Sequence, residues 1–168
     1  PVPCALRFGK DVRAGAVATD MKVEAEDGAV RIATGPLVLR LAPGQLWLAG
    51  AALDGREMLR DDGRAQAHVD FLRPQSGYAV GTTHPEGAPD PGPVRIDKVE
   101  IEEGGPLRAV VRLEGRAEAQ EQPRVILRLE AYAGRPFVRL FHTVEFLHKD
   151  PRLAFVRRMG LHLPLALE

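Results

Sequence analysis

The sequence predicts an all-β protein folded as an antiparallel β-sandwich. Apolar and polar residues alternate with a period of two along most of the 168 residues, which is the pattern of strands that bury one face. Glycine and proline, with 17 and 14 residues, interrupt this alternation where the chain must turn. Many short strands separated by such turns are typical of sandwiches and barrels, and no segment has a convincing helical period.

The first half of the chain is expected to hold two hairpins and two further strands. Residues 21–25 and 30–32 pair around Asp27-Gly28, because glycine accepts the positive φ of a tight turn. Asp54-Gly55 predicts a second hairpin, and the remaining strands are expected at residues 37–41 and 65–71. The segment 74–93 is rich in glycine and proline, so we expect a long surface loop there.

The second half carries the strongest strand patterns, which are expected at residues 94–101, 107–113, 125–132, 137–146 and 159–165. Residues 137–146 differ from the others because both faces of the segment are apolar. A strand with this pattern is typically central in its sheet and covered on both sides. We therefore expect the segment to be the most buried strand of the protein.

Composition excludes several classes of function. The 23 basic and 23 acidic residues give a formal net charge of +0, so neither a nucleic-acid partner nor a polybasic membrane face is expected. Cys4 is the single cysteine, which rules out an internal disulfide and a thiolate zinc site. Nucleotide-binding glycine motifs are absent, and the single serine, Ser76, lies outside any nucleophile elbow. We expect no cofactor and no metal.

Two side chains of the doubly apolar segment are candidate catalytic groups. His142 shares a face with apolar neighbours, so it is either a core histidine bonded to the backbone or a base with an environment-tuned pKa. Arg139 lies on the opposite face, where it is either a solvated ion-pair partner or a clamp for the carboxylate of an acidic sugar.

Three further side chains are candidate substrate-binding groups. Trp47 and Tyr78 are rare aromatic residues in this chain, and sugar rings stack on flat aromatic faces. Trp47 nevertheless lies between two leucines, which favours a place in the core or at an interface. Tyr78 and His84 fall in the predicted long loop, where binding groups concentrate but solvated side chains are also common.

Four segments together resemble the exo-rhamnogalacturonan lyase-like proteins of bacteria and fungi. They are residues 31–41 (RIATGPLVLRL), 105–115 (GPLRAVVRLEG), 127–143 (LRLEAYAGRPFVRLFHT) and 158–163 (RMGLHL), in that order along the chain. The resemblance implies an N-terminal β domain, a central β-sandwich and a C-terminal (α/α) toroid. On this basis residues 1–16 are the tail of a preceding β domain or a linker, and residues 17–168 are the sandwich.

The resemblance implies a domain of a larger bacterial enzyme that degrades polysaccharide by β-elimination. The sandwich would scaffold or wall the substrate cleft of a helical catalytic domain that is not part of these residues. Its partners would be the other domains of its own parent chain and an acidic plant polysaccharide or oligosaccharide. Alternatives are a non-catalytic carbohydrate-binding module, a purely structural sandwich, and part of a glycoside hydrolase using two of Glu114, Glu130 and Glu145.

Overall fold

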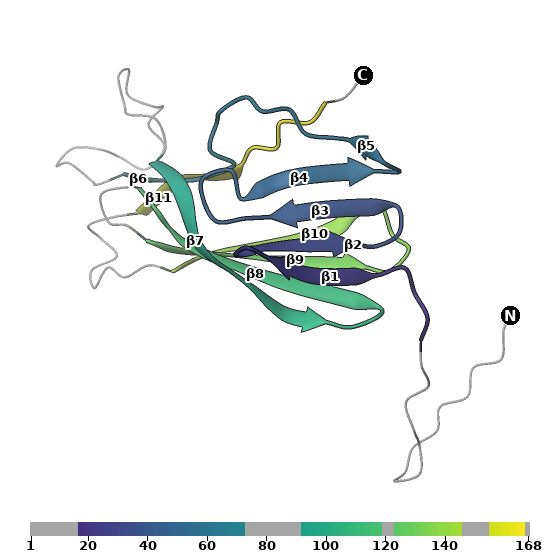
Figure 1. The fold of residues 1–168 in the computed structure, drawn as a ribbon. Coiled ribbons are helices and arrows are strands. Elements are labelled where there is room, and N and C mark those ends of the chain that lie inside the picture. Colours follow the sequence, from purple (N-terminus) through teal and green to yellow (C-terminus); the bar gives the residue numbers. More distant parts are fainter. Residues whose placement is uncertain (1–16, 73–91, 119–122, 146–154, 167–168) are drawn as a thin grey trace, which may run out of the picture.

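The computed structural model describes residues 17–72, 92–118, 123–145 and 155–166, which form two antiparallel sheets that face each other (Figure 1). The five-stranded sheet has the order β1-β2-β3-β4-β5, with the strands β1 (Lys22–Glu26), β2 (Ala29–Ala33), β3 (Leu37–Leu41), β4 (Leu48–Leu53) and β5 (Arg56–Glu57). The predicted β-sandwich is confirmed. Across the described residues, no helix is long and apolar enough to cross a membrane.

The six-stranded sheet has the order β10-β9-β8-β7-β6-β11. Its strands are β6 (Ala67–Leu72), β7 (Gly92–Gly104), β8 (Arg108–Ala117), β9 (Arg124–Tyr132), β10 (Val138–Glu145) and β11 (Phe155–Leu161). β7 is the long strand of the sheet: it pairs with β8 along most of its length and with β6 only near its first residues. β6 and β11 therefore extend the sheet from one end of β7.

Both Asp-Gly turns form as the sequence predicts. Asp27 and Gly28 have φ values of 45° and 79°, and Asp54 and Gly55 have values of 50° and 81°. Two central residues with positive φ are the mark of a type I′ turn, the connection that suits the twist of paired strands. Each turn fixes the register of its hairpin, as in the pairing of Glu26 with Ala29.

The core lies between the two sheets. Every second residue of the main strands is buried and joins one apolar cluster, whose largest fully buried members are Trp47, Ile32, Leu41, Ile96, Leu113 and Leu127. Gly115 of β8 allows β7 to approach closely, because a Cβ at this position would lie 2.0 Å from the carbonyl oxygen of Arg95. The register of β7 against β8 shifts beside this contact, between Ile96 and Lys98.

Thr34 ties the two sheets together at one end of the sandwich. Its hydroxyl donates to the carbonyl of Arg135 in the β9–β10 turn at 2.8 Å, and its own carbonyl accepts from the Gly134 amide at 2.6 Å. Gly35 follows with a φ of 109° and packs near the Cα of Gly134. The TGPL segment thus has a structural role as a link between the sheets.

The predicted position of residues 137–146 is wrong. β10 is the end strand of the six-stranded sheet, and its outer face is open: Phe137 and Phe141 are 51% and 49% exposed. Only the inner face, with Val138, Leu140 and Val144, packs against the core. Apolar residues on both faces show that both can be covered, but no described residue of this chain covers the outer one.

Candidate functional site

His142 lies on the inner face of β10, opposite the buried Leu127 of β9. Burial lowers the pKa of the imidazole below its ordinary value, and the positive charge of His68 lowers it further. The Nε2 atom of His142 is shielded from solvent and has no hydrogen-bond partner among the described residues. The ring is therefore held neutral, which suits a proton acceptor, although its position inside the sandwich restricts access to a substrate.

His68 of β6 is the second imidazole of this region. Its ring covers Gly160 of β11, where an added Cβ would lie 2.6 Å from the Nε2 atom of His68. Strands β6 and β10 are thus close enough for their histidines to interact electrostatically, although the sheet order separates them. This pair could not be predicted from the sequence, because the two residues are 74 positions apart in strands that are not hydrogen-bonded.

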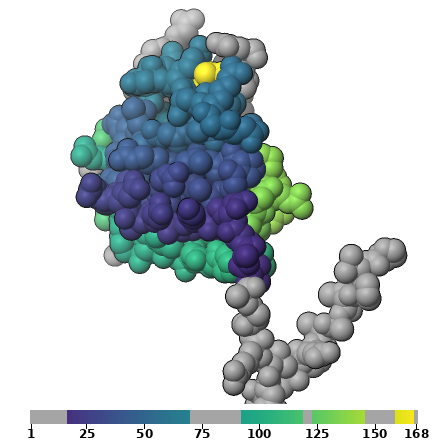
Figure 2. All heavy atoms as spheres, turned by 45° about the vertical axis from the view of Figure 1, so that its right-hand side comes forward, coloured from purple at the N-terminus to yellow at the C-terminus, as the bar shows by residue number. Residues whose placement is uncertain are grey.

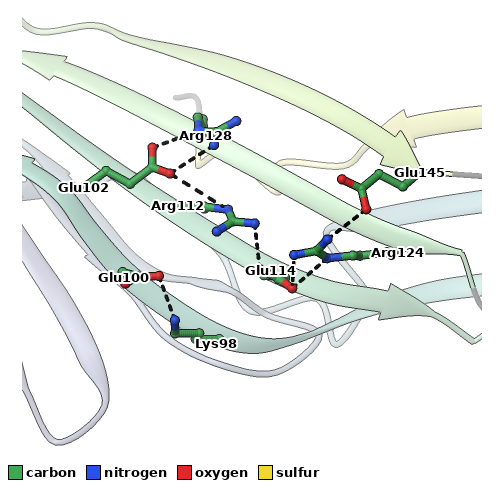
Figure 3. Close-up of polar contacts among 8 residues, drawn as sticks. All are labelled: Lys98, Glu100, Glu102, Arg112, Glu114, Arg124, Arg128 and Glu145. Atoms are coloured by element: carbon green, nitrogen blue, oxygen red, sulfur yellow. Dashed lines mark hydrogen bonds and ion pairs between the residues drawn. The ribbon is translucent and has the colours of Figure 1, made fainter.

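The outer face of the six-stranded sheet carries a chain of ion pairs with alternating sign (Figure 3). Arg128 donates to both oxygens of Glu102, at 2.8 and 3.0 Å, and lowers the pKa of that carboxyl. Arg112 lies 3.9 Å from Glu102 and 2.8 Å from Glu114. Arg124 completes the chain by contacting Glu114 at 2.5 Å and Glu145 at 2.9 Å.

This network has two consequences for function. The outward-facing Val110 and Ile126 are both buried, as expected where the stems of long side chains lie over apolar residues. The carboxylates that a glycoside hydrolase would need are also engaged: Glu114 and Glu145 are held by arginines, and Glu130 accepts a hydrogen bond from Tyr132 at 2.7 Å. Each of these carboxylates would have to break such a contact before it could serve as one of a catalytic pair.

Arg139 lies on the same outer face but has a different environment. It stands opposite Glu130 in the register, yet it makes no ion pair or side-chain hydrogen bond with any described residue. Phe137 and Phe141 lie two residues away on either side, so they share its face of the strand. The rings of Phe137 and Tyr132 are 6.1 Å apart at an interplanar angle of 43°. An exposed guanidinium is thus surrounded by exposed aromatic carbon.

A pocket of about 320 Å³ lies where the C-terminal segment meets the loop after β5. Its lining includes Leu46, Leu59, Asp62, Gln66 and Pro164. The polar groups at its walls are mostly satisfied: Gln66 bonds both the amide and the carbonyl of Leu48, at 2.7 and 3.0 Å. We interpret the pocket as part of the packing between the C-terminal segment and the rest of the sandwich, and Figure 2 shows a small yellow part of that segment at the surface among blue residues.

Asp62, which lines this pocket, contacts His162 of β11's C-terminal continuation. The imidazole donates to the carboxylate at 2.6 Å, and this hydrogen bond is the main cause that lowers the pKa of Asp62. The two residues are 100 positions apart and no motif contains both, so the sequence could not reveal their contact.

The remaining predicted site residues are placed as follows. Trp47 is 1% exposed, so its ring has no free face on which a sugar could stack in this structure. Its indole nitrogen is buried and has no hydrogen-bond partner among the described residues. Tyr78 and His84 lie outside the described residues. In the described part of the chain, no three His, Cys, Asp or Glu side chains gather in a way that could hold a metal ion.

Comparison with known proteins matches the chain to a domain family and to a short part of a longer relative. The family model described as "PcRGLX-like protein central beta sandwich domain" matches residues 21–168. A curated relative, the uncharacterized protein YetA of Bacillus subtilis (strain 168), is 34% identical over 77 residues. That match covers 44% of this chain and 9% of the relative, so the chain spans only a small part of the relative's length.

Proposed function

The chain belongs to the PcRGLX-like proteins, as their central β-sandwich domain, and from this premise we propose that it scaffolds the substrate cleft of a larger polysaccharide-degrading enzyme. The observation that carries the proposal is the family match over residues 21–168 to a domain described as central. A central domain has neighbours in its own chain, and these would supply the main catalytic groups. The polysaccharide substrate follows from the resemblance to exo-rhamnogalacturonan lyase-like proteins.

The chemistry proposed for the whole enzyme is β-elimination. A base removes the proton α to the uronate carboxylate, and the enolate that forms expels the leaving oxygen as the carbon–carbon double bond appears. An acid then protonates that oxygen. This chain supports the reaction mainly by position, because the carboxylates of its outer face are held in ion pairs or hydrogen bonds. Arg139 and His142 are the side chains of this chain to test for a contribution to the site.

An activity assay of the longer protein tests this proposal directly. Incubation of the longer protein with rhamnogalacturonan oligosaccharides, followed at the ultraviolet band of unsaturated uronates, is expected to show product. The 168-residue chain at the same concentration is expected to show none. Absence of unsaturated product from the longer protein would overturn the lyase assignment, and product from the 168-residue chain would overturn the scaffold role.

Variants of the longer protein decide whether this domain reaches the reacting atoms. His142→Gln and Arg139→Gln are compared with Arg116→Gln, which changes an exposed arginine of β8 on the same outer face. A fall in kcat in a folded His142 or Arg139 variant, with Arg116→Gln unchanged, would make the affected residue a contributor to the site. Unchanged kcat in all three would leave the domain as a scaffold.

The carbohydrate-binding alternative has less support from the geometry. Such a module needs an exposed aromatic platform, and Trp47 is buried. The exposed rings near Arg139 are Phe137 and Phe141, which have no hydroxyl group to offer to a sugar.

A further inference from the structure

The outer face of β10 is the feature of this molecule that its own chain leaves unexplained. We name as the β10 face the side chains of Tyr132, Phe137, Arg139 and Phe141. Two half-exposed phenylalanines, one in an edge strand and one directly before it, are an unusual surface, because exposed edges are normally short, charged or interrupted. Figure 2 shows the light-green part of the chain that contains this strand as a protruding flank of the molecule.

The sequence pattern of β10 predicts that this face is covered. β10 is apolar on both sides, which is the pattern of a strand buried between two layers. The inner layer is the core of the sandwich, whereas no described residue of the chain forms the outer layer. A second layer is therefore expected to come from outside the described residues.

The charges of the outer face indicate which charge the covering layer carries. Arg108, Arg112, Arg124 and Arg128 are all neutralised by glutamates of the same sheet. Arg139, between its two phenylalanines, has no such partner among the described residues. Covering its guanidinium without a counter-charge would be costly, so the surface that covers it must offer a carboxylate.

We propose that the β10 face is the docking surface for a neighbouring domain of the same longer chain, which seats Phe137 and Phe141 in apolar contacts and pairs a carboxylate with Arg139. The inference rests on the proposed function only in that the sandwich is one domain of a longer protein. Phenylalanine, which lacks a polar group, favours a protein surface over a sugar as the occupant.

The size of the face favours a domain of the same chain over a second copy. Each half-exposed phenylalanine offers about 100 Å² of apolar surface, whereas a stable complex of separate proteins buries about 800 Å² on each partner. A covalently linked domain needs less contact, because the linker raises its effective concentration. Two free copies joined through this face alone would associate weakly.

Hydroxyl-radical footprinting of the longer protein tests the proposal, since it measures how accessible each phenyl ring is to solvent. Phe137 and Phe141 are expected to be oxidised about fivefold more slowly than half-exposed rings would be, because the centre of an interface packs like a protein interior. Phe141→Asp is expected to restore fast oxidation of Phe137. The matched control Leu163→Asp, at an exposed leucine of the C-terminal segment, is expected to leave both rings protected.

The charge component is tested separately. Arg139→Glu is expected to expose Phe137 and Phe141 in the longer protein, while Arg116→Glu, a charge reversal on the same face, is expected to leave them protected. Fast oxidation of both rings in the wild-type longer protein would overturn the proposal. A wild-type dimer that Phe141→Asp converts to monomer would also overturn it, in favour of a second copy.

These results do not depend on catalysis. A protected β10 face in a protein without lyase activity would keep the docking surface and remove the proposed reaction. Full lyase activity in a longer protein whose β10 face is exposed would keep the proposed reaction and remove the docking surface.

Discussion

Gly115→Ala is expected to destabilise the protein, although alanine usually stabilises a position that does not require positive φ. At such sites alanine reduces the entropy of the unfolded chain and adds about 0.4 to 1 kcal/mol of stability. At Gly115 the new Cβ would lie 2.0 Å from the carbonyl oxygen of Arg95 and 2.7 Å from the Cα of Ile96. Both atoms belong to the backbone of β7, so relief requires a shift of the strand.

Forcing extra atoms into a packed interior costs about 1 to 3 kcal/mol, and backbone obstruction favours the upper end. After subtraction of the entropic gain, we expect a net loss of about 2 kcal/mol, which corresponds to a fall of roughly 4 to 8 °C in Tm for a domain of this size. The measurement is thermal and urea unfolding followed by circular dichroism.

Gly50→Ala is the matched control, because it is the same substitution in another strand, β4. Its new Cβ would meet only the Cβ of Arg40, at an ordinary contact distance of 3.6 Å. We expect this variant to unfold about 1 to 3 °C above the wild type. A Gly115→Ala protein that unfolds at or above the wild-type temperature would refute the close approach of β7 to β8.

Three further predictions concern buried polar groups. Gln66→Ala removes the side chain that bonds both backbone groups of Leu48, so the free energy of unfolding should fall by about 2 to 3 kcal/mol in urea titrations. Thr34→Val, which keeps the shape but removes the hydroxyl, should cost about 1 to 3 kcal/mol by leaving the Arg135 carbonyl unbonded, and amide exchange should show the β9–β10 turn opening first. The pKa of His142 is below its ordinary value of 6.5 in the folded protein, so the unfolded chain binds more protons and the free energy of unfolding decreases as pH falls through 6.5 towards the folded pKa. His142→Gln should make the free energy of unfolding less dependent on pH between pH 7 and 5.5.

The elements that could be predicted from the sequence are those fixed by local chemistry. Asp27-Gly28 and Asp54-Gly55 carry their own backbone preference, so the turns and the hairpins around them follow from neighbouring residues. The faces of β10 follow in the same way, because alternation places His142 inward and Arg139 outward whatever the rest of the chain does.

The features that could not be predicted depend on contacts between distant segments. The neighbours of β10 are set by sheet order, and an apolar face does not say whether its cover lies in the same domain. The electrostatic interaction of His142 with His68 and the hydrogen bond of Asp62 with His162 join residues far apart in the chain, with no motif to connect them. Trp47 differs from these cases, because its neighbouring leucines favoured a place in the core and the ring is buried.

The ion-pair network also bears on whether this domain alone can bind an acidic polysaccharide. Affinity for a polyanion requires cations that are not already neutralised, and the formal net charge of the chain is +0. Glu102, Glu114 and Glu145 pair with Arg112, Arg124 and Arg128 on the outer face, so a polyuronate would meet carboxylates there as well as cations.

We therefore expect the 168-residue chain to migrate without retardation in native gels that contain rhamnogalacturonan at physiological salt. Retardation that disappears in Arg139→Gln but persists in Arg116→Gln would contradict this expectation. It would show that Arg139 engages the carboxylate of a sugar, and the domain would then be a binding module in its own right.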